Sequence, residues 1–418
     1  MKKLLIAVLC LMLTGCAAPA PSDGSGPDRS VSPDIPAPSP AASSAPNGES
    51  GPPQASPETD PETAENPSAS QEPSESSLGP QNQEQIIQEL LSAMTLEEKV
   101  GQMFFVRCPE PGGAELAAQY KVGGYLLFGR DFKDKTAQQV RDDIQSYQDA
   151  SGIPLLIGTD EEGGTVVRAS SNPDLFPQRE PAPQTLFAQG GMDLILQDAR
   201  QKSMTLLDLG VNVNFAPVAD VSTDPADFIY ARSFGQDAQA TANYVAQVVG
   251  VMGEEQIGSV LKHFPGYGNN VDTHTGIALD QRPYETFQTS DFLPFQAGIQ
   301  AGADAVLVSH NIAASMDESL PASLSPTVHK ILREELGFDG VVLTDDLAMD
   351  AVMEYAQNGS AAVLAIQAGN DMVVTTDFQT QIPQVIHAVQ SGVIAESQID
   401  QAVTRVLNWK YELGLLGN

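Results

Sequence analysis

Residues 341–347 read VVLTDDL, an apolar and β-branched run that ends in two aspartates. Such a run is typical of a strand buried in a parallel sheet. The strand carries Asp345 and Asp346 to its carboxyl end, where the pattern turns helical. One aspartate at such a place can cap a helix through its free N–H groups, and we assign this role to Asp346. Helix capping does not account for Asp345, which is therefore a candidate for a functional role.

Seven other short apolar runs have the same character, with amphipathic helical patterns between or after them. They cover residues 103–106, 124–128, 155–159, 213–216, 259–262, 305–309 and 372–375. The clearest helical patterns cover residues 136–148, 194–209, 328–336 and 384–389, and residues 95–98 read as a capping box. Within residues 83–418 this alternation predicts a (β/α)₈ barrel. A doubly wound open sheet has the same local pattern, and periodicity alone does not separate the two.

Polar residues at the ends of the predicted strands favour the barrel. Asp160, the pair Lys262 and His263, His310 and Asp345 all stand at or just after such runs. A barrel brings all its strand ends to one mouth, whereas an open sheet concentrates ligand residues at one switch point.

The first residues have the character of a secretory signal. Two lysines and a short apolar run lead to LTGC at 13–16, which resembles a bacterial lipobox. We therefore expect residues 1–15 to be removed and Cys16 to carry a lipid. Residues 16–82 are rich in Pro, Ser and acidic residues and predict a disordered tether. Its reach suits a thick wall, so we expect an extracytoplasmic, lipid-anchored protein of a Gram-positive-type envelope.

Composition narrows the other possibilities. The net charge of −33 argues against nucleic acid as a partner, because phosphate binding needs clustered cations. No later apolar run is long enough to span a bilayer. With Cys10 in the signal and Cys16 lipidated, Cys108 stands alone, which leaves no intramolecular disulfide. We interpret Cys108 as a packing residue.

Residues 262–274 read KHFPGYGNNVDTH, and Gly266 and Gly268 make this segment pliable. Asp272 and His274 can face each other across a tight turn. A carboxylate on one imidazole nitrogen fixes the tautomer and raises the basicity of the other, which suits a general acid/base. An ordinary loop histidine is the alternative for His274. Metal binding by His263, Asp272 and His274 is another, although the spacing of a known zinc site is lacking.

Residues 331–348, ILREELGFDGVVLTDDLA, resemble the active-site signature of glycoside hydrolase family 3, with Asp345 in the position of the nucleophile. Residues 262–274 resemble the corresponding motif of the β-N-acetylglucosaminidase branch of that family. The resemblance covers residues 90–418 and implies that Asp272 and His274 form the acid/base pair. The β-glucosidase branch instead uses a Glu from a second domain, for which this chain has no room.

The resemblance also implies substrate contacts. Residues 159–164, TDEEGG, match the family's Asp-x-Glu-Gly-Gly, and residues 231–234 match its Arg-Ser-Phe segment. The implied sugar-binding residues are Asp160, Arg168, Arg232, Lys262 and His263. Ordinary ion pairing is the alternative for the two arginines.

Two positions depart from the branch. Tyr267 stands where it has His, and Thr165 stands where it has Arg. Both departures leave the chemistry possible but put a preference for muropeptide-type substrates in doubt.

The resemblance implies a retaining β-N-acetylglucosaminidase that acts on peptidoglycan or chitin-type fragments through a covalent glycosyl-Asp345 intermediate. We expect a carbohydrate substrate, a membrane contact through Cys16, a monomer, and neither cofactor nor metal. A β-N-acetylglucosaminide phosphorylase remains an alternative, because a histidine tolerates phosphate better than a glutamate does. A non-catalytic sugar-binding lipoprotein is the second alternative.

Overall fold

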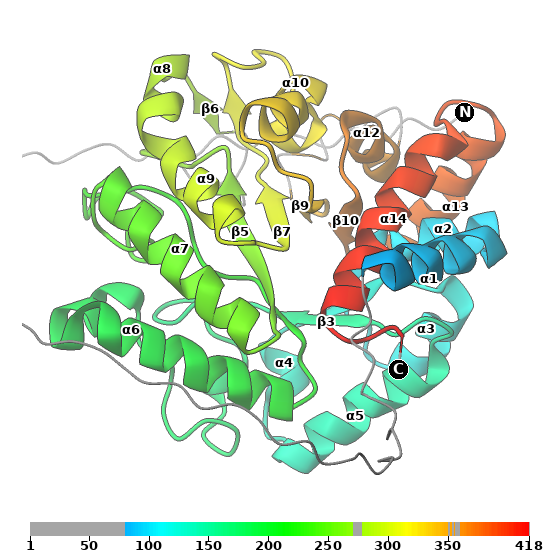
Figure 1. The fold of residues 1–418 in the computed structure, drawn as a ribbon, viewed down its shortest axis with the longest axis horizontal. Coiled ribbons are helices and arrows are strands. Elements are labelled where there is room, and N and C mark those ends of the chain that lie inside the picture. Colours follow the sequence, from blue (N-terminus) through cyan, green and yellow to red (C-terminus); the bar gives the residue numbers. More distant parts are fainter. Residues whose placement is uncertain (1–79, 271–277, 350–351, 353–354, 356–359, 418) are drawn as a thin grey trace, which may run out of the picture. The chain divides into compact units, whose positions relative to one another are not determined.

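The computed structural model describes residues 80–270, 278–349, 352, 355 and 360–417. Its centre is a closed barrel of parallel strands in the order β1-β2-β3-β4-β5-β7-β9-β10 (Figure 1). The strands are β1 Phe104–Arg107, β2 Gly124–Leu127, β3 Leu156–Thr159, β4 Val213–Asn214, β5 Gly258–Phe264, β7 Ala305–Val308, β9 Val341–Asp346 and β10 Met372–Thr375. Because β1 also pairs with β10, the sheet has no free edge, which confirms the barrel and excludes the open sheet.

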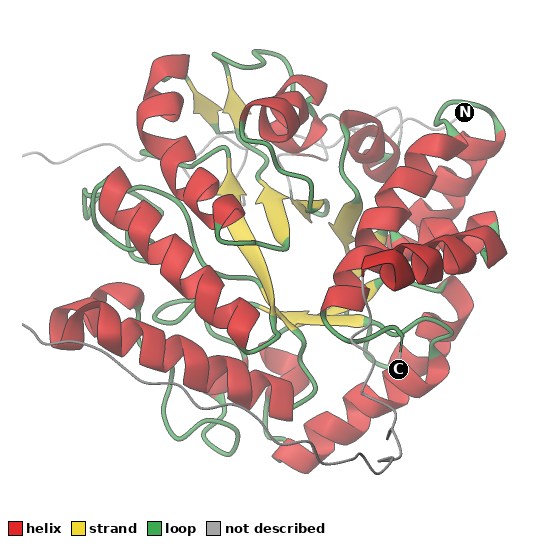
Figure 2. Cartoon of the chain, viewed as in Figure 1, coloured by secondary structure: helices red, strands yellow, loops and turns green. Residues whose placement is uncertain are grey.

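Helices surround the strands, as Figure 2 shows. They are α1 Pro80–Ala93, α2 Leu96–Gln102, α3 Gly113–Tyr120, α4 Gly129–Phe132, α5 Ala137–Ala150, α6 Pro183–Asp208, α7 Ala238–Glu254, α8 Tyr284–Thr286, α9 Phe292–Gln300, α10 Pro326–Lys330, α12 Ala361–Ala368, α13 Phe378–Gln390 and α14 Glu396–Glu412. A separate pair of short strands, β6 Leu279–Asp280 and β8 Ile312–Ala313, is formed after β5 and β7. Among the described helices, none has both the length and the apolar character needed to cross a bilayer.

Helix boundaries follow local chemistry. Thr95 forms the predicted capping box with Glu98 at the start of α2. The helix predicted over residues 328–336 is α10 followed by a π-helical turn, Ile331–Glu335. Helix α1 begins at Pro80, inside the stretch assigned to the tether from composition. Proline suits a first turn, whose N–H groups have no helical partner.

Alternation along the strands builds two cores. In β1, Phe105 faces the barrel interior, while Phe104 and Val106 face the helices. The interior is closed at the amino ends of the strands by Trp409 of α14. A Cβ at Gly258, the first residue of β5, would lie 3.0 Å from the Trp409 ring. The opposite, carboxyl ends of the strands remain open for a site.

Lys410, beside this plug, is fully buried, and no carboxylate of the described residues pairs with it. Its Nζ donates to Oε1 of Gln102 at 2.6 Å, and Gln102 in turn donates to the carbonyl of Lys121 at 2.9 Å. Burial lowers the pKa of Lys410 to about 7 from its ordinary 10.5. Between those values the unfolded chain binds a proton that the native chain does not.

We therefore expect the unfolding free energy of the wild type to rise with pH from about 7 to about 10 relative to that of Lys410→Met, by on the order of 3–5 kcal/mol. Urea denaturation of both proteins across this range measures the difference. Lys330→Met removes an exposed lysine from α10 and is the control, since it should track the wild type. Parallel pH profiles for wild type and Lys410→Met would contradict the prediction.

Candidate active site

Strand alternation brings three of the predicted site residues, Asp160, Lys262 and Asp345, to the barrel mouth. Leu343 in β9 and Val260 in β5 face the interior, so Asp345 and Lys262, two residues further, do the same at the carboxyl end. Asp160 follows β3 in the same way. These three residues line one pocket of about 390 Å³ together with Arg168, Arg232 and His263. That volume lies within the ~300–1,000 Å³ of small-molecule sites.

The pocket floor is apolar and is lined by the barrel-interior residues Leu126, Phe215, Leu307 and Val374. Phe105 and Phe215 pack edge to face in the barrel interior, with ring centroids 5.2 Å apart. A Cβ at Gly158, two residues before Asp160, would lie 2.7 Å from Phe215 and 2.8 Å from Phe105. Glycine at position 158 thus lets both rings fill the space below the polar layer.

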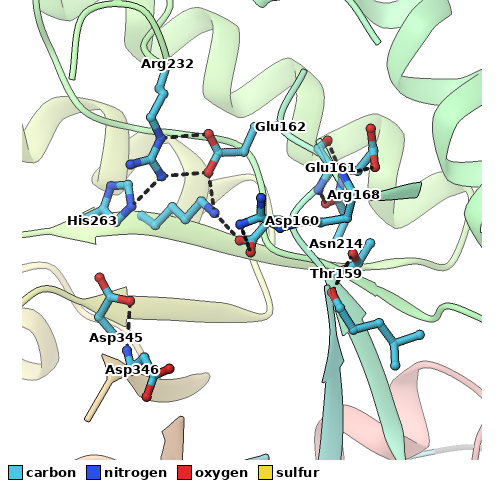
Figure 3. A network of polar contacts seen from close by, with 12 residues as sticks. Thr159, Asp160, Glu161, Glu162, Arg168, Asn214, Arg232, His263, Asp345 and Asp346 are labelled. Atoms are coloured by element: carbon cyan, nitrogen blue, oxygen red, sulfur yellow. Dashed lines mark hydrogen bonds and ion pairs between the residues drawn. The ribbon is translucent and has the colours of Figure 1, made fainter. Parts of the chain in front are cut away.

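Lys262 belongs to an ion-pair network at the mouth. Figure 3 labels Asp160, Glu162 and Arg232, which also belong to this network. The Nζ of Lys262 lies 2.7 Å from Oδ1 of Asp160 and 2.6 Å from Oε1 of Glu162. Arg168 donates to the other oxygen of Asp160 at 3.2 Å. Asp160 thereby has both oxygens held by cations, and its side chain is only partly exposed to the pocket.

Glu162 was not among the predicted site residues, although it stands in the quoted 159–164 motif. Arg232 binds its carboxylate in bidentate fashion, with Nε and an NH2 group at 3.0 and 2.8 Å. Burial opposes ionisation, but Lys262 and Arg232 outweigh it and hold the pKa of Glu162 well below its ordinary range. Glu162 is therefore a permanent anion that fixes two cations of the pocket.

The protonation of His263 follows from its neighbours. An NH2 group of Arg232 lies 3.0 Å from His263 Nε2, and because arginine only donates, Nε2 accepts. The proton is then on Nδ1, which donates to Oδ2 of Asp220 at 2.7 Å. Asp220 also accepts from the backbone N–H groups of His263 and Tyr267. Sequence reasoning missed Asp220, which belongs to no motif and lies four residues beyond the end of the run predicted over residues 213–216.

Asp345 faces this network across the pocket in Figure 3. Its Oδ1 accepts from the N–H of Asp346 at 2.8 Å. The end of β9 is held by His310 after β7, whose Nε2 donates to the carbonyl of Asp346 at 3.0 Å. The carboxylate of Asp346 accepts from Ala348 in a turn, rather than from a helix that starts there. His310 therefore positions the strand end that carries Asp345.

Glu161, the other acidic residue of the motif, faces away from the pocket. It is buried, and its carboxylate accepts from the backbone N–H groups of Arg168, Ala169 and Ser170. Its own backbone is held by the side chain of Asn214 from β4. These bonds fix the turn that presents Arg168 to the mouth.

The two departures from the branch lie in different surroundings. Tyr267 is buried, with its ring packed edge to face on His263 at 5.1 Å. Thr165 is exposed at the tip of a turn, outside the residues that line the pocket. Tyr267 thus contacts a predicted sugar-binding residue, whereas Thr165 does not reach the pocket wall.

Gly266 and Gly268 are required by close packing, a stronger reason than pliability. Both have positive φ, at 118° and 52°. A Cβ at Gly266 would lie 2.4 Å from Asp291, and one at Gly268 would lie 2.3 Å from Arg282. Arg282 also donates to the carbonyl of Gly266. The described chain is therefore anchored up to the segment that contains Asp272 and His274, which lie outside the described residues.

The sequence also raised the roles of two cysteines and the possibility of a metal site. Cys108 is buried, and burial raises the pKa of its thiol to about 12, as expected for a packing residue. Within the described ranges, no group of His, Cys, Asp and Glu is arranged to hold a metal ion. Cys16 lies outside the described residues.

Comparisons with known proteins agree on one family. Residues 95–409 match the Glycosyl hydrolase family 3 N terminal domain. A β-hexosaminidase of Stenotrophomonas maltophilia is 35% identical over 318 residues, which cover 73% of this chain and 89% of that protein. One of Xanthomonas campestris is 32% identical over 315 residues, covering 73% of this chain and 90% of the relative.

Solved structures give the same answer. A family 3 β-N-acetylglucosaminidase of Paenibacillus superposes with a TM-score of 0.71 at 30% identity, covering 78% of this chain and 64% of that one. A β-N-acetylhexosaminidase of Beutenbergia cavernae gives 0.66 at 29% identity, covering 75% and 98%. Fold, strand-end residues and sequence relatives together show that the chain belongs to glycoside hydrolase family 3.

Proposed function

We propose that the protein is a retaining β-N-acetylglucosaminidase that releases terminal β-N-acetylglucosamine from cell-wall or chitin-type fragments. The observation that carries this proposal is the pocket in which Asp345 faces the hydroxyl-binding candidates Asp160, Lys262 and His263. Relatives that share most of their length with this chain are named β-hexosaminidases. The names of these relatives support N-acetylglucosamine as the released sugar, while the position of Asp345 in the pocket supports its role as the nucleophile.

In the proposed reaction Asp345 attacks C1 of the terminal sugar and forms a glycosyl ester. The N–H of Asp346 donates to Oδ1 of Asp345 and so helps to orient the attacking carboxylate. Lys262 and Asp160 offer a donor and an acceptor to the hydroxyls, and neutral His263 is oriented by Asp220. Rigid ion pairs keep these groups in place without reorganisation during the reaction.

His274, oriented by Asp272, is proposed to protonate the leaving oxygen and then to deprotonate the attacking water. Support comes from the 262–274 motif and from its anchored entry at Gly266. His274→Ala should lower kcat by roughly 10²–10⁴-fold for an alkyl or sugar leaving group, and far less for an activated aryl group. Steady-state kinetics on paired substrates measure this. Equal losses on both would remove His274 from the acid role.

A screen of aryl β-glycosides tests the activity directly. The N-acetylglucosaminide should be hydrolysed with a much higher kcat/KM than the glucoside or the xyloside, and the first-formed sugar should be the β-anomer. Product analysis with and without phosphate separates hydrolysis from phosphorolysis. Turnover of the glucoside alone, or an α-anomer as first product, would contradict the proposal.

We also propose attachment to the outer face of the bacterial membrane through a lipid on Cys16. The lipobox-like residues 13–16 and the Pro-rich stretch that follows support it. Metabolic labelling with a fatty acid should mark the wild type and spare Cys16→Ser. Equal labelling, or none in either protein, would refute the anchor.

A further inference from the structure

Arg107, the last residue of β1, lines the catalytic pocket but belongs to none of the motifs described above. Phe105 faces the barrel interior, so Arg107, two residues further, faces it at the mouth. The register pairs Arg107 with Leu126 of β2. Its place in the strand order is opposite β5, which carries Lys262 and His263.

Arg107 differs from the three other cations that line the pocket. Lys262 pairs with Asp160 and Glu162, Arg168 pairs with Asp160, and Arg232 pairs with Glu162. Arg107 forms no hydrogen bond or ion pair with any residue in the described part of the chain. Its Nε is buried without a partner among the described residues, which is unfavourable for a polar group.

An aromatic ring holds the guanidinium of Arg107 in place. Its Cζ lies 4.2 Å from the centroid of Phe128, a residue that also lines the pocket. The Cζ of Arg168 lies 5.2 Å from the same centroid, and the Nε of Arg168 is likewise buried and unpartnered. The guanidinium groups of Arg107 and Arg168 therefore contact the same ring. Among the described residues, Asp160 is the sole carboxylate that pairs with either arginine, and it pairs with Arg168.

We propose that Arg107 binds an oxyanion, a carboxylate or a phosphate, of the ligand held in this pocket, so that the enzyme selects an acidic substrate. The inference rests on the proposed function, since the pocket must hold a sugar. A guanidinium presents paired N–H donors that match the two oxygens of such a group. Stacking on Phe128 orients those donors in advance and lowers the entropy lost on binding.

Charge makes this cation stand out. The chain carries a net charge of −33, which repels acidic glycans at long range. An arginine that no described carboxylate neutralises, at the mouth of an otherwise paired network, provides local attraction for an anion. The oxyanion has two possible sources, an acidic substituent on the glycan or free phosphate that takes the place of water.

The first measurement is binding of inorganic phosphate, at constant ionic strength, as competitive inhibition of a neutral aryl N-acetylglucosaminide and by calorimetry. Arg107→Met should weaken phosphate binding roughly 10- to 100-fold, the range for loss of a hydrogen bond to a charged group. Arg107→Lys should retain most of it. Arg141→Met, which removes a partly exposed arginine of α5 that is not among the residues lining the pocket, should bind phosphate as the wild type does. Melting curves establish that each variant is folded.

The second measurement identifies the source. For a glycan substituent, the ratio of kcat/KM for the 6-O-phosphorylated or 6-carboxylated aryl glycoside over that for the neutral one should fall in Arg107→Met. For free phosphate, the sugar 1-phosphate should form in the wild type and be lost in the variant. The proposal would be overturned if Arg107→Met bound phosphate as tightly as the wild type. It would also be overturned if the substitution changed neither the kcat/KM ratio nor the formation of sugar 1-phosphate. Calorimetry measures phosphate binding without turnover. A protein with no activity in the glycoside screen can therefore still show whether Arg107 binds phosphate, so failure of the proposed function and failure of the Arg107 site are distinguishable.

Discussion

Asp345→Ala is expected to lower kcat on the aryl N-acetylglucosaminide by on the order of 10⁵-fold or more, similar to the loss of other covalent nucleophiles. Without this carboxylate the proposed glycosyl ester cannot form, and the reaction must proceed in one step. The substitution also removes an acceptor for the N–H of Asp346, which is a small effect beside the loss of the proposed nucleophile. Steady-state kinetics, with limits set by contaminating wild type, provide the measurement.

Two further experiments separate a nucleophile from a merely structural carboxylate. Asp346→Ala should lose far less activity, because its carboxylate holds a turn through Ala348. Added azide should rescue Asp345→Ala by entering the vacated space and attacking C1, with the α-glycosyl azide as product. Near-wild-type turnover in Asp345→Ala, or equal losses at the two neighbouring aspartates, would end the assignment of Asp345.

Glu162→Ala is expected to cost about 3–5 kcal/mol of unfolding free energy, as does removal of one partner from a buried ion pair. Lys262 and Arg232 would both lose the anion that compensates their burial. The kcat/KM should fall by more than about 100-fold, since these cations hold His263 and Asp160 in place. Chemical denaturation and kinetics on the same preparations measure both effects. If Glu162→Ala were as stable as the wild type, Glu162 would not be needed to compensate the buried charges of Lys262 and Arg232.

The pH dependence gives Glu162 a second, independent test. Its pKa is lowered in the native state from the ordinary 4.5, so the unfolded chain takes up a proton first as the solution becomes acidic. The stability contributed by Glu162 is present in full above pH 4.5 and is lost progressively below it, down to the native pKa. Glu162→Gln should therefore show a shallower loss of stability in acid than the wild type. Identical slopes would contradict the lowered pKa.

Much of the fold was predictable because its signals are local. The eight apolar runs coincide with the eight strands of the barrel, and the capping box at Thr95 starts α2 as expected. Period-two alternation also points Asp160, Lys262 and Asp345 inward at the mouth. The same rule applied to Phe105 would have drawn attention to Arg107, which sequence reasoning passed over because it belongs to no motif.

By itself, the sequence determined the strands, the helices around them and the side chains carried to the strand ends, because hydrophobic periodicity and capping act between near neighbours. Only the tertiary structure decided which charges pair. Glu162 with Arg232, His263 with Asp220 and His310 with the carbonyl of Asp346 join segments that are 36 to 70 residues apart. Ion pairs and hydrogen bonds depend on direction and on distances of about 3 Å, which a linear pattern does not encode. Closure of the barrel sets those distances. It therefore also decides that Arg107 is the one arginine or lysine of the pocket that no described carboxylate neutralises.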